Sequence, residues 1–98
     1  MSGSPSEEVY ERREIRFSGR VQGVGFRYTT RDIATRFRVT GFVQNMHDGR
    51  VLLVVEGERQ EIDNFLNALR NETQRNIRGE ESTTMPVTNE YIEFSIHH

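Results

Sequence analysis

The sequence GRVQGVGFR, residues 19–27, separates a stretch with strand periodicity from a stretch with helix periodicity. Its three glycines, Gly19, Gly23 and Gly25, allow a tight turn that brings several backbone N–H groups toward one point. The helix that follows adds unpaired first-turn N–H groups and the positive end of its dipole. Arg27 falls on that first turn, where a cation is unfavourable unless an anion lies beside it. The segment therefore predicts an anion site in which Arg27 completes a cradle of backbone amides.

The loop does not match the common nucleotide-binding motifs. It lacks the Gly-Lys-Ser/Thr ending of a P-loop, and its glycines do not have the Gly-x-Gly-x-x-Gly spacing of dinucleotide-binding folds. Glycine-rich turns between a strand and a helix also occur as plain connectors. The residues alone thus leave two interpretations open, an anion site and a connector.

The flanking segments predict the order βαββαβ. An Asp-Gly pair at Asp48-Gly49 lies between two β-rich runs and indicates a hairpin. The polar segment 72–90 is compatible with either an edge strand or a mobile loop. The expected elements are strand 11–19, helix 26–38, strands 39–45 and 50–56, helix 58–71, and strand 91–96 with Ile92, Phe94 and Ile96 buried.

This order favours an α+β ferredoxin-like sandwich, with a four-stranded antiparallel sheet and two helices on one face. One domain is expected over residues 11–98, preceded by a disordered N-terminal lead over residues 1–10, which begins with small and polar residues. A chain of 98 residues has room for one modest core.

The composition excludes several classes of chemistry. The chain contains no cysteine, so disulfides, zinc–thiolate sites and thiol nucleophiles are excluded. No set of His, Asp and Glu has the spacing of metal ligands, so we expect neither a metal nor another cofactor. No apolar run approaches the ~20 residues needed to span a bilayer, and we expect a cytoplasmic protein without a membrane partner.

The charge is unevenly distributed along the chain, which has a net charge of -2 and thirteen basic residues, all arginine. Residues 1–50 carry nine arginines against six acidic residues, whereas residues 51–98 carry four against nine. The half that contains the glycine-rich loop would therefore attract a small anion. The excess is too small to predict a nucleic acid as partner.

Three motifs in this order resemble the acylphosphatase family: GRVQGVGFR at 19–27, GFVQN at 41–45 and DGRV at 48–51. The resemblance implies hydrolysis of a small-molecule acyl phosphate to a carboxylate and inorganic phosphate by a metal-free monomer. It assigns the binding of the attacking water to Asn45 and the binding of the phosphoryl group to Arg27 together with the loop residues Arg20, Val21, Gln22, Gly23, Val24 and Gly25.

Two other functions stay open from the sequence, a non-catalytic phosphate-binding module and an RNA-binding sheet. RNA binding on a sheet requires exposed aromatic residues on the central strands, and the first strand offers Arg16 and Ser18 instead. Without the loop, Asn45 would be interpreted as a turn residue. His47 is interpreted as a solvated hairpin residue rather than a base, and the final two histidines as a tail rather than a metal site.

Overall fold

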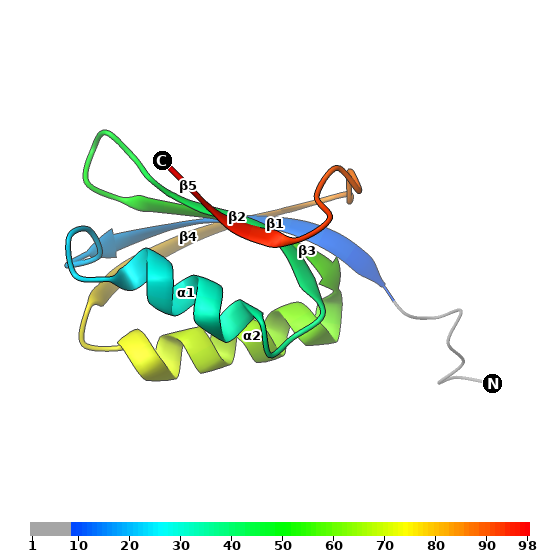
Figure 1. The fold of residues 1–98 in the computed structure, drawn as a ribbon, viewed down its shortest axis with the longest axis horizontal. Helices are drawn as coiled ribbons and strands as arrows, with labels where there is room; N and C mark the ends of the chain where they lie inside the picture. Colours follow the sequence, from blue (N-terminus) through cyan, green and yellow to red (C-terminus); the bar gives the residue numbers. More distant parts are fainter. Residues whose placement is uncertain (1–8) are drawn as a thin grey trace.

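Two helices cover one face of a single β-sheet in the computed structural model, which describes residues 9–98 (Figure 1). The expected α+β ferredoxin-like arrangement, with both helices on the same face, is confirmed. The elements are β1 (Tyr10–Gly19), α1 (Phe26–Ala34), β2 (Val39–Asn45), β3 (Val51–Glu58), α2 (Arg59–Thr73), β4 (Ile77–Met85) and β5 (Phe94–His97).

The sheet has five strands in the order β4-β1-β3-β2-β5, so the prediction of four strands is wrong. The prediction of a wholly antiparallel sheet is also wrong, because β5 runs parallel to β2 along one edge. The fifth strand is β4, which arises from the undecided segment 72–90 and pairs antiparallel with β1. Most β4 side chains are exposed, so backbone pairing, rather than an alternation of buried side chains, holds this strand in place.

Several boundaries differ from those expected. Helix α1 ends at Ala34 rather than at residue 38, because the amides of Arg36 and Phe37 bond three residues back, to Ile33 and Ala34. The prediction that Ile92 is buried is wrong, since its side chain is 94% exposed and β5 begins only at Phe94. Residues 1–8 of the expected lead lie outside the described residues, and β1 begins at Tyr10.

The core lies between the sheet and the helices. Alternate residues of β1 and β3 point toward the helices and are fully buried, including Ile15, Phe17 and Leu53. The apolar stripe of α2 meets them at i, i+3, i+4 and i+7 spacing through Ile62, Phe65, Leu66 and Leu69, all of which are buried.

A buried carboxylate on the opposite face of the sheet fastens the segment between β4 and β5. The Glu56 side chain is 4% exposed and accepts hydrogen bonds from the backbone N–H groups of Thr88 (2.9 Å) and Asn89 (3.0 Å). Arg12 Nη1 donates to the same carboxylate over 3.2 Å. Burial would raise the pKa of the Glu56 carboxyl, but these bonds outweigh burial and hold the pKa below its usual value.

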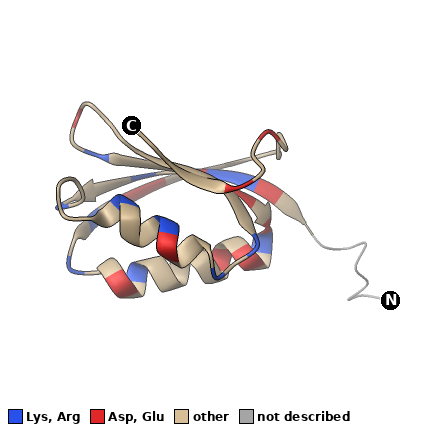
Figure 2. Ribbon diagram, in the orientation of Figure 1, with Lys and Arg blue, Asp and Glu red and all other residues tan. Residues whose placement is uncertain are grey.

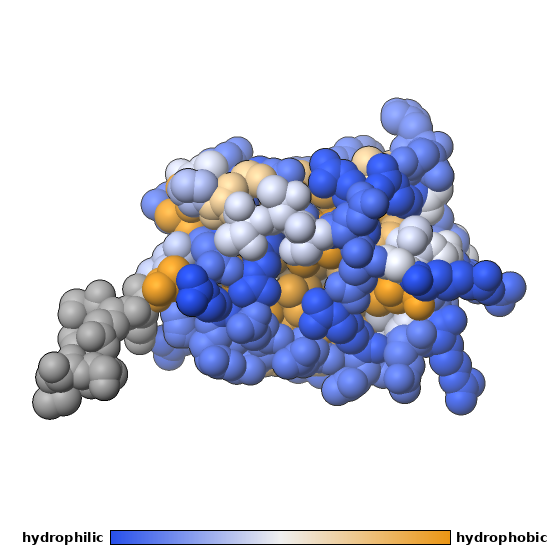
Figure 3. Space-filling model, turned by 180° about the vertical axis from the view of Figure 1, so that it is seen from behind, coloured by the Kyte–Doolittle hydropathy of each residue, from blue (hydrophilic) through white to orange (hydrophobic). Residues whose placement is uncertain are grey.

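The surface is polar on most of the molecule. Acidic and basic positions are interspersed over both the sheet and the helices (Figure 2). Seen from behind, the surface is mainly hydrophilic, with small separate hydrophobic patches (Figure 3). Within residues 9–98, neither helix has the length and apolar character needed to cross a membrane.

We expect acid to destabilise the fold partly through Glu56. Its pKa is lower in the folded state than in the unfolded chain, so its contribution to stability is present above the ordinary glutamate pKa and is lost as the pH falls through the folded-state pKa. Glu56→Gln should lower the free energy of unfolding at pH 7 by about 1–3 kcal/mol and should flatten its decrease toward acid. Urea unfolding between pH 3 and 7 measures both effects. Exposed Glu93 provides the control variant Glu93→Gln, and equal acid sensitivity of the Glu56 variant and the wild type would contradict the assignment.

Candidate active site

The loop between β1 and α1 owes its shape to glycine dihedral angles. Gly23 and Gly25 have φ values of 76° and 79°, a region that residues with a Cβ rarely adopt. A Cβ added at either position would meet nothing within 4 Å, so the dihedral angle and not the space requires glycine here. The loop can therefore direct successive amides toward one side, as an anion cradle requires.

The loop leads directly into the N-terminus of α1. Gly25 is the N-cap residue, in the left-handed conformation and without a side-chain cap, and the first turn contains no acidic residue. The positive end of the helix dipole is thus not neutralised by a neighbouring carboxylate of that turn. Arg27 adds a full positive charge on the same turn, so this end of the helix is strongly suited to an anion.

Arg27 and Asn45 are brought together in one cavity. Its volume is about 170 Å³, and it is formed where the loop and the start of α1 face the end of β2. The residues that line it are Val21, Gly23, Gly25, Phe26, Arg27, Tyr28 and Asn45. Two segments that are distant in the sequence, each containing a predicted site residue, therefore line the same cavity.

Strand alternation explains the place of Asn45. Val39, Gly41 and Val43 are buried toward the helices, and Asn45 is the next residue on that face of β2. Its Oδ1 atom is buried and has no hydrogen-bond partner among residues 9–98. A buried polar atom without a partner costs about 1–3 kcal/mol, and such atoms are often retained for function.

The Arg27 side chain is half-buried and lies beside the C-terminal strand. Its Nη1 donates to the carbonyl oxygen of His97 over 3.2 Å and lies 3.5 Å from Nδ1 of His98. A guanidinium carries five N–H donors, so this contact uses only part of its capacity.

The loop residues do not all face the cavity. The backbone N–H of Arg20 donates to the carbonyl of Asn76 (2.8 Å), so this amide is already engaged, and the Arg20 side chain is exposed. Val24 contributes to a hollow on another side of the loop, together with Thr73 and Asn76. Of the loop residues, Val21, Gly23 and Gly25 line the cavity.

Gln22 makes a connection that the sequence did not predict. Its Nε2 donates to the carbonyl oxygens of Met46 and Arg50, each over 2.8 Å, and thereby joins the loop to the β2–β3 hairpin. No local pattern indicates this pair of bonds, because both acceptors are backbone atoms more than twenty residues away.

Tyr28 is the second feature missed from the sequence. It lines the cavity, is 52% exposed, and lies with its ring 5.4 Å from the guanidinium carbon of Arg31. The sequence did contain a signal for this residue, since an aromatic side chain directly follows Arg27 on the first turn of the helix.

The hairpin turn holds His47 and Asp48. The Asp48 carboxylate accepts hydrogen bonds from the backbone N–H of Arg50 (3.1 Å) and from Arg50 Nε (2.9 Å). Asp48 therefore has a structural role in the turn. Neither Asp48 nor exposed His47 lines the cavity. Among residues 9–98, no group of three or more His, Cys, Asp and Glu side chains is arranged to hold a metal ion.

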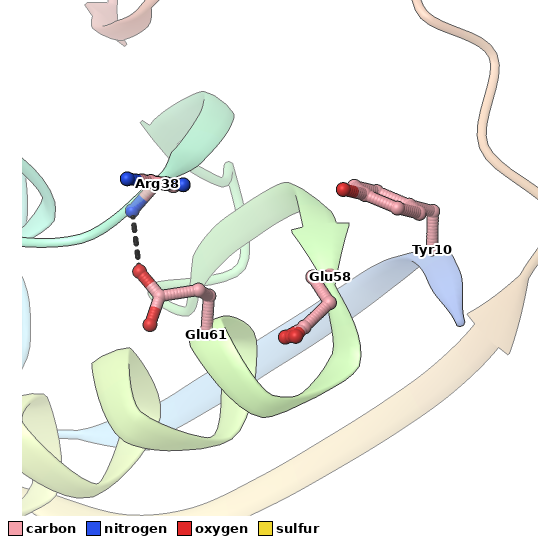
Figure 4. Close-up of a pocket in the computed structure, with 4 residues that line it drawn as sticks. All are labelled: Tyr10, Arg38, Glu58 and Glu61. Carbon is pink, nitrogen blue, oxygen red and sulfur yellow. Dashed lines mark hydrogen bonds between the residues drawn. The ribbon is translucent and has the colours of Figure 1, made fainter. Parts of the chain in front are cut away.

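A larger cavity, of about 370 Å³, lies where β1 begins and β3 ends, at the opposite end of the sheet from the glycine loop (Figure 1 and Figure 4). Its walls are Tyr10, Arg38, Glu58 and Glu61, where β3 passes into α2. The backbone N–H of Arg38 donates to Glu61 Oε1 over 2.8 Å. Glu61 therefore serves the local structure by fixing the start of β2 to α2.

The family model for acylphosphatase matches residues 13–96, and the chain belongs to the acylphosphatase family. The acylphosphatase of Archaeoglobus fulgidus is 49% identical over 57 residues. That alignment spans 58% of this chain and 64% of the relative, so less than two thirds of the relative's length is matched.

Solved structures share the whole fold. The crystal structure of acylphosphatase from Bacillus subtilis has a TM-score of 0.80 and 30% identity, and the match covers 90% of this chain and 99% of that one. The structure of HypF from T. kodakarensis has a TM-score of 0.74 and 28% identity, and the match covers 93% of this chain but only 12% of HypF. Domains of this fold thus occur both alone and within a much longer chain.

Orthophosphate should bind in the cavity. When the protein is titrated with orthophosphate, we expect shifts in the amide resonances of those residues between 21 and 27 that line the cavity. Arg27→Lys should weaken phosphate binding at least about tenfold, because an ammonium cannot replace the bidentate fork of a guanidinium. Arg31→Lys on the same helix is the matched control and should bind as the wild type does. Amide shifts that are absent at saturating phosphate would exclude the anion site.

Proposed function

We propose that this protein hydrolyses acyl phosphates, releasing a carboxylate and inorganic phosphate. The observation that carries the proposal is the shared cavity, which is lined by Gly23 and Gly25 of the left-handed glycine loop, by Arg27 and by Asn45. Membership of the acylphosphatase family supports the same reaction.

The loop and Arg27 are suited to bind the phosphoryl group. Phosphoryl transfer depends mainly on positioning and on donors that stabilise charge on the equatorial oxygens. The N–H groups at the loop and at the start of α1 would supply such donors, and the planar fork of Arg27 would hold two oxygens at once. These groups provide charge stabilisation from the chain itself, so the reaction as proposed requires no metal ion.

Asn45 is suited to hold the attacking water. It lines the same cavity as the loop, and its buried Oδ1 has no hydrogen-bond partner among residues 9–98 and can accept a hydrogen bond from a water. The water would attack phosphorus in line with the departing carboxylate and pass its proton to a phosphoryl oxygen. A carboxylate leaves without protonation, so no general acid is needed, which agrees with the position of His47 outside the cavity.

The other functions left open by the sequence have less support. In the middle of β1 the outer face of the sheet carries Arg12 and Glu14, which pair with one another at 3.0 Å, and the exposed aromatic residue of this strand, Tyr10, lies at its first position rather than at its centre. A non-catalytic phosphate-binding module would share the cavity and differs only in turnover. We further propose that the protein is a cytoplasmic monomer, in keeping with the expectation from the sequence.

Turnover of an acyl phosphate is the direct test. Benzoyl phosphate should be hydrolysed at an unchanged rate after treatment with EDTA, because the amides and Arg27 stabilise the charge. A phosphomonoester should be hydrolysed far more slowly, since its alkoxide is a poor leaving group and, among residues 9–98, no Asp, Glu or His side chain lines the cavity. Phosphate binding without turnover would identify a binding module instead.

Asn45→Ala should separate turnover from binding. We expect kcat to fall about 10²- to 10³-fold, as is typical when one preorganised donor or acceptor is removed. The inhibition constant for phosphate should change little, since the loop and Arg27 remain. A large loss of phosphate affinity would instead make Asn45 a structural residue of the hairpin. His47→Ala, two residues along, is the control and should retain wild-type rates.

A further inference from the structure

The bonds of Gln22 are additional to those that form the hairpin. Met46 and Arg50 already close the turn, because the Met46 N–H donates to the Arg50 carbonyl (2.8 Å) and the Gly49 N–H donates to the Met46 carbonyl (3.2 Å). Each carbonyl oxygen has two lone pairs, and Gln22 Nε2 bonds to both oxygens from the loop. The hairpin turn is therefore closed by its own backbone hydrogen bonds, and Gln22 connects the hairpin to the β1–α1 loop.

The chain neighbours of these bonded groups line the cavity. Val21 and Gly23, on either side of Gln22, line it from the loop. Asn45, directly before the acceptor Met46, lines it from the hairpin. The Gln22 side chain is thus a cross-link whose two ends lie one residue away from the phosphate cradle and from the water-binding amide.

We propose that Gln22 is a positioning residue, which sets the separation between Asn45 and the phosphate cradle. This inference rests on the proposed acyl phosphate hydrolysis. Gln22 acts through Asn45, because the attacking water must lie in line with the phosphorus while the phosphoryl group is held by the opposite wall. A misplacement of about 1 Å in such an arrangement can cost about 10²-fold in rate.

The chemistry of the cross-link selects a glutamine. Its terminal NH₂ carries two donors, one for each carbonyl oxygen. A glutamate at this position would place a carboxylate, which has no donor when ionised, against two carbonyl oxygens. An asparagine has the same amide but is one methylene shorter, so its reach to the two oxygens is reduced. Methionine has a similar length and no donor, so Gln22→Met removes both hydrogen bonds with little change in volume.

A double-mutant cycle with Asn45 tests the role. We expect Gln22→Met to lower kcat for benzoyl phosphate about 10- to 100-fold, while the inhibition constant for phosphate changes less than about threefold. In the Asn45→Ala background, the same substitution should lower kcat by less than about threefold, because the residue through which Gln22 acts is already absent.

Two outcomes would overturn the positioning role. Independent, multiplicative losses in the double variant would show that Gln22 does not act through Asn45. A loss of phosphate affinity equal to the loss in kcat would show that Gln22 only maintains the loop. Gln60→Met is the matched control: Gln60 Nε2 also donates, to Asn64 Oδ1 (3.1 Å), both residues lie on the exposed face of α2, and the kcat of this variant should equal that of the wild type. A wild type without turnover would reject the proposed function together with this role, whereas an active wild type with multiplicative losses rejects the role alone.

Discussion

The register between β1, β3 and β2 is the constraint on which the site depends. Val51 of β3 lies opposite Phe17 of β1 on one side and opposite Asn45 of β2 on the other. Phe17 and Val51 are fully buried under the helices, and this row fixes Asn45 on the helix-covered face. A shift of one residue in β2 would turn Asn45 to the opposite face of the sheet, away from the loop. The hydrophobic core therefore positions the polar site.

The features predicted correctly are those encoded over short distances. The glycine loop, the Asp-Gly hairpin and the helix periodicity of α2 are each specified by neighbouring residues, and each is present in the structure. That Arg27 and Asn45 share a cavity could not be predicted from neighbouring residues alone, because it depends on strand pairing. The resemblance to acylphosphatases supplied that information.

The features that were missed depend on contacts between distant segments. Strand β4 has almost no buried side chain, so its sequence contains no alternation from which a strand could be predicted. The parallel pairing of Gly41 with Phe94 in β5 is a choice of sheet edge that local residues do not encode. The bonds of Gln22 depend on the path of the hairpin backbone, which the identities of Met46 and Arg50 do not reveal. All three features could not be predicted for the same reason: each depends on contacts between segments that are distant in the sequence.

Strand β4 also forms one edge of the sheet. It is an edge strand, and an unpaired edge is a template for aggregation. Here that edge carries two acidic side chains: Glu80 forms a two-point ion pair with Arg70 (2.8 and 3.0 Å), and Glu81 lies 3.3 Å from Arg50. A second copy that added a strand at this edge would bury few apolar side chains. The polar side chains that kept β4 from being predicted from the sequence are thus of the kind that natural edge strands use against edge-to-edge pairing.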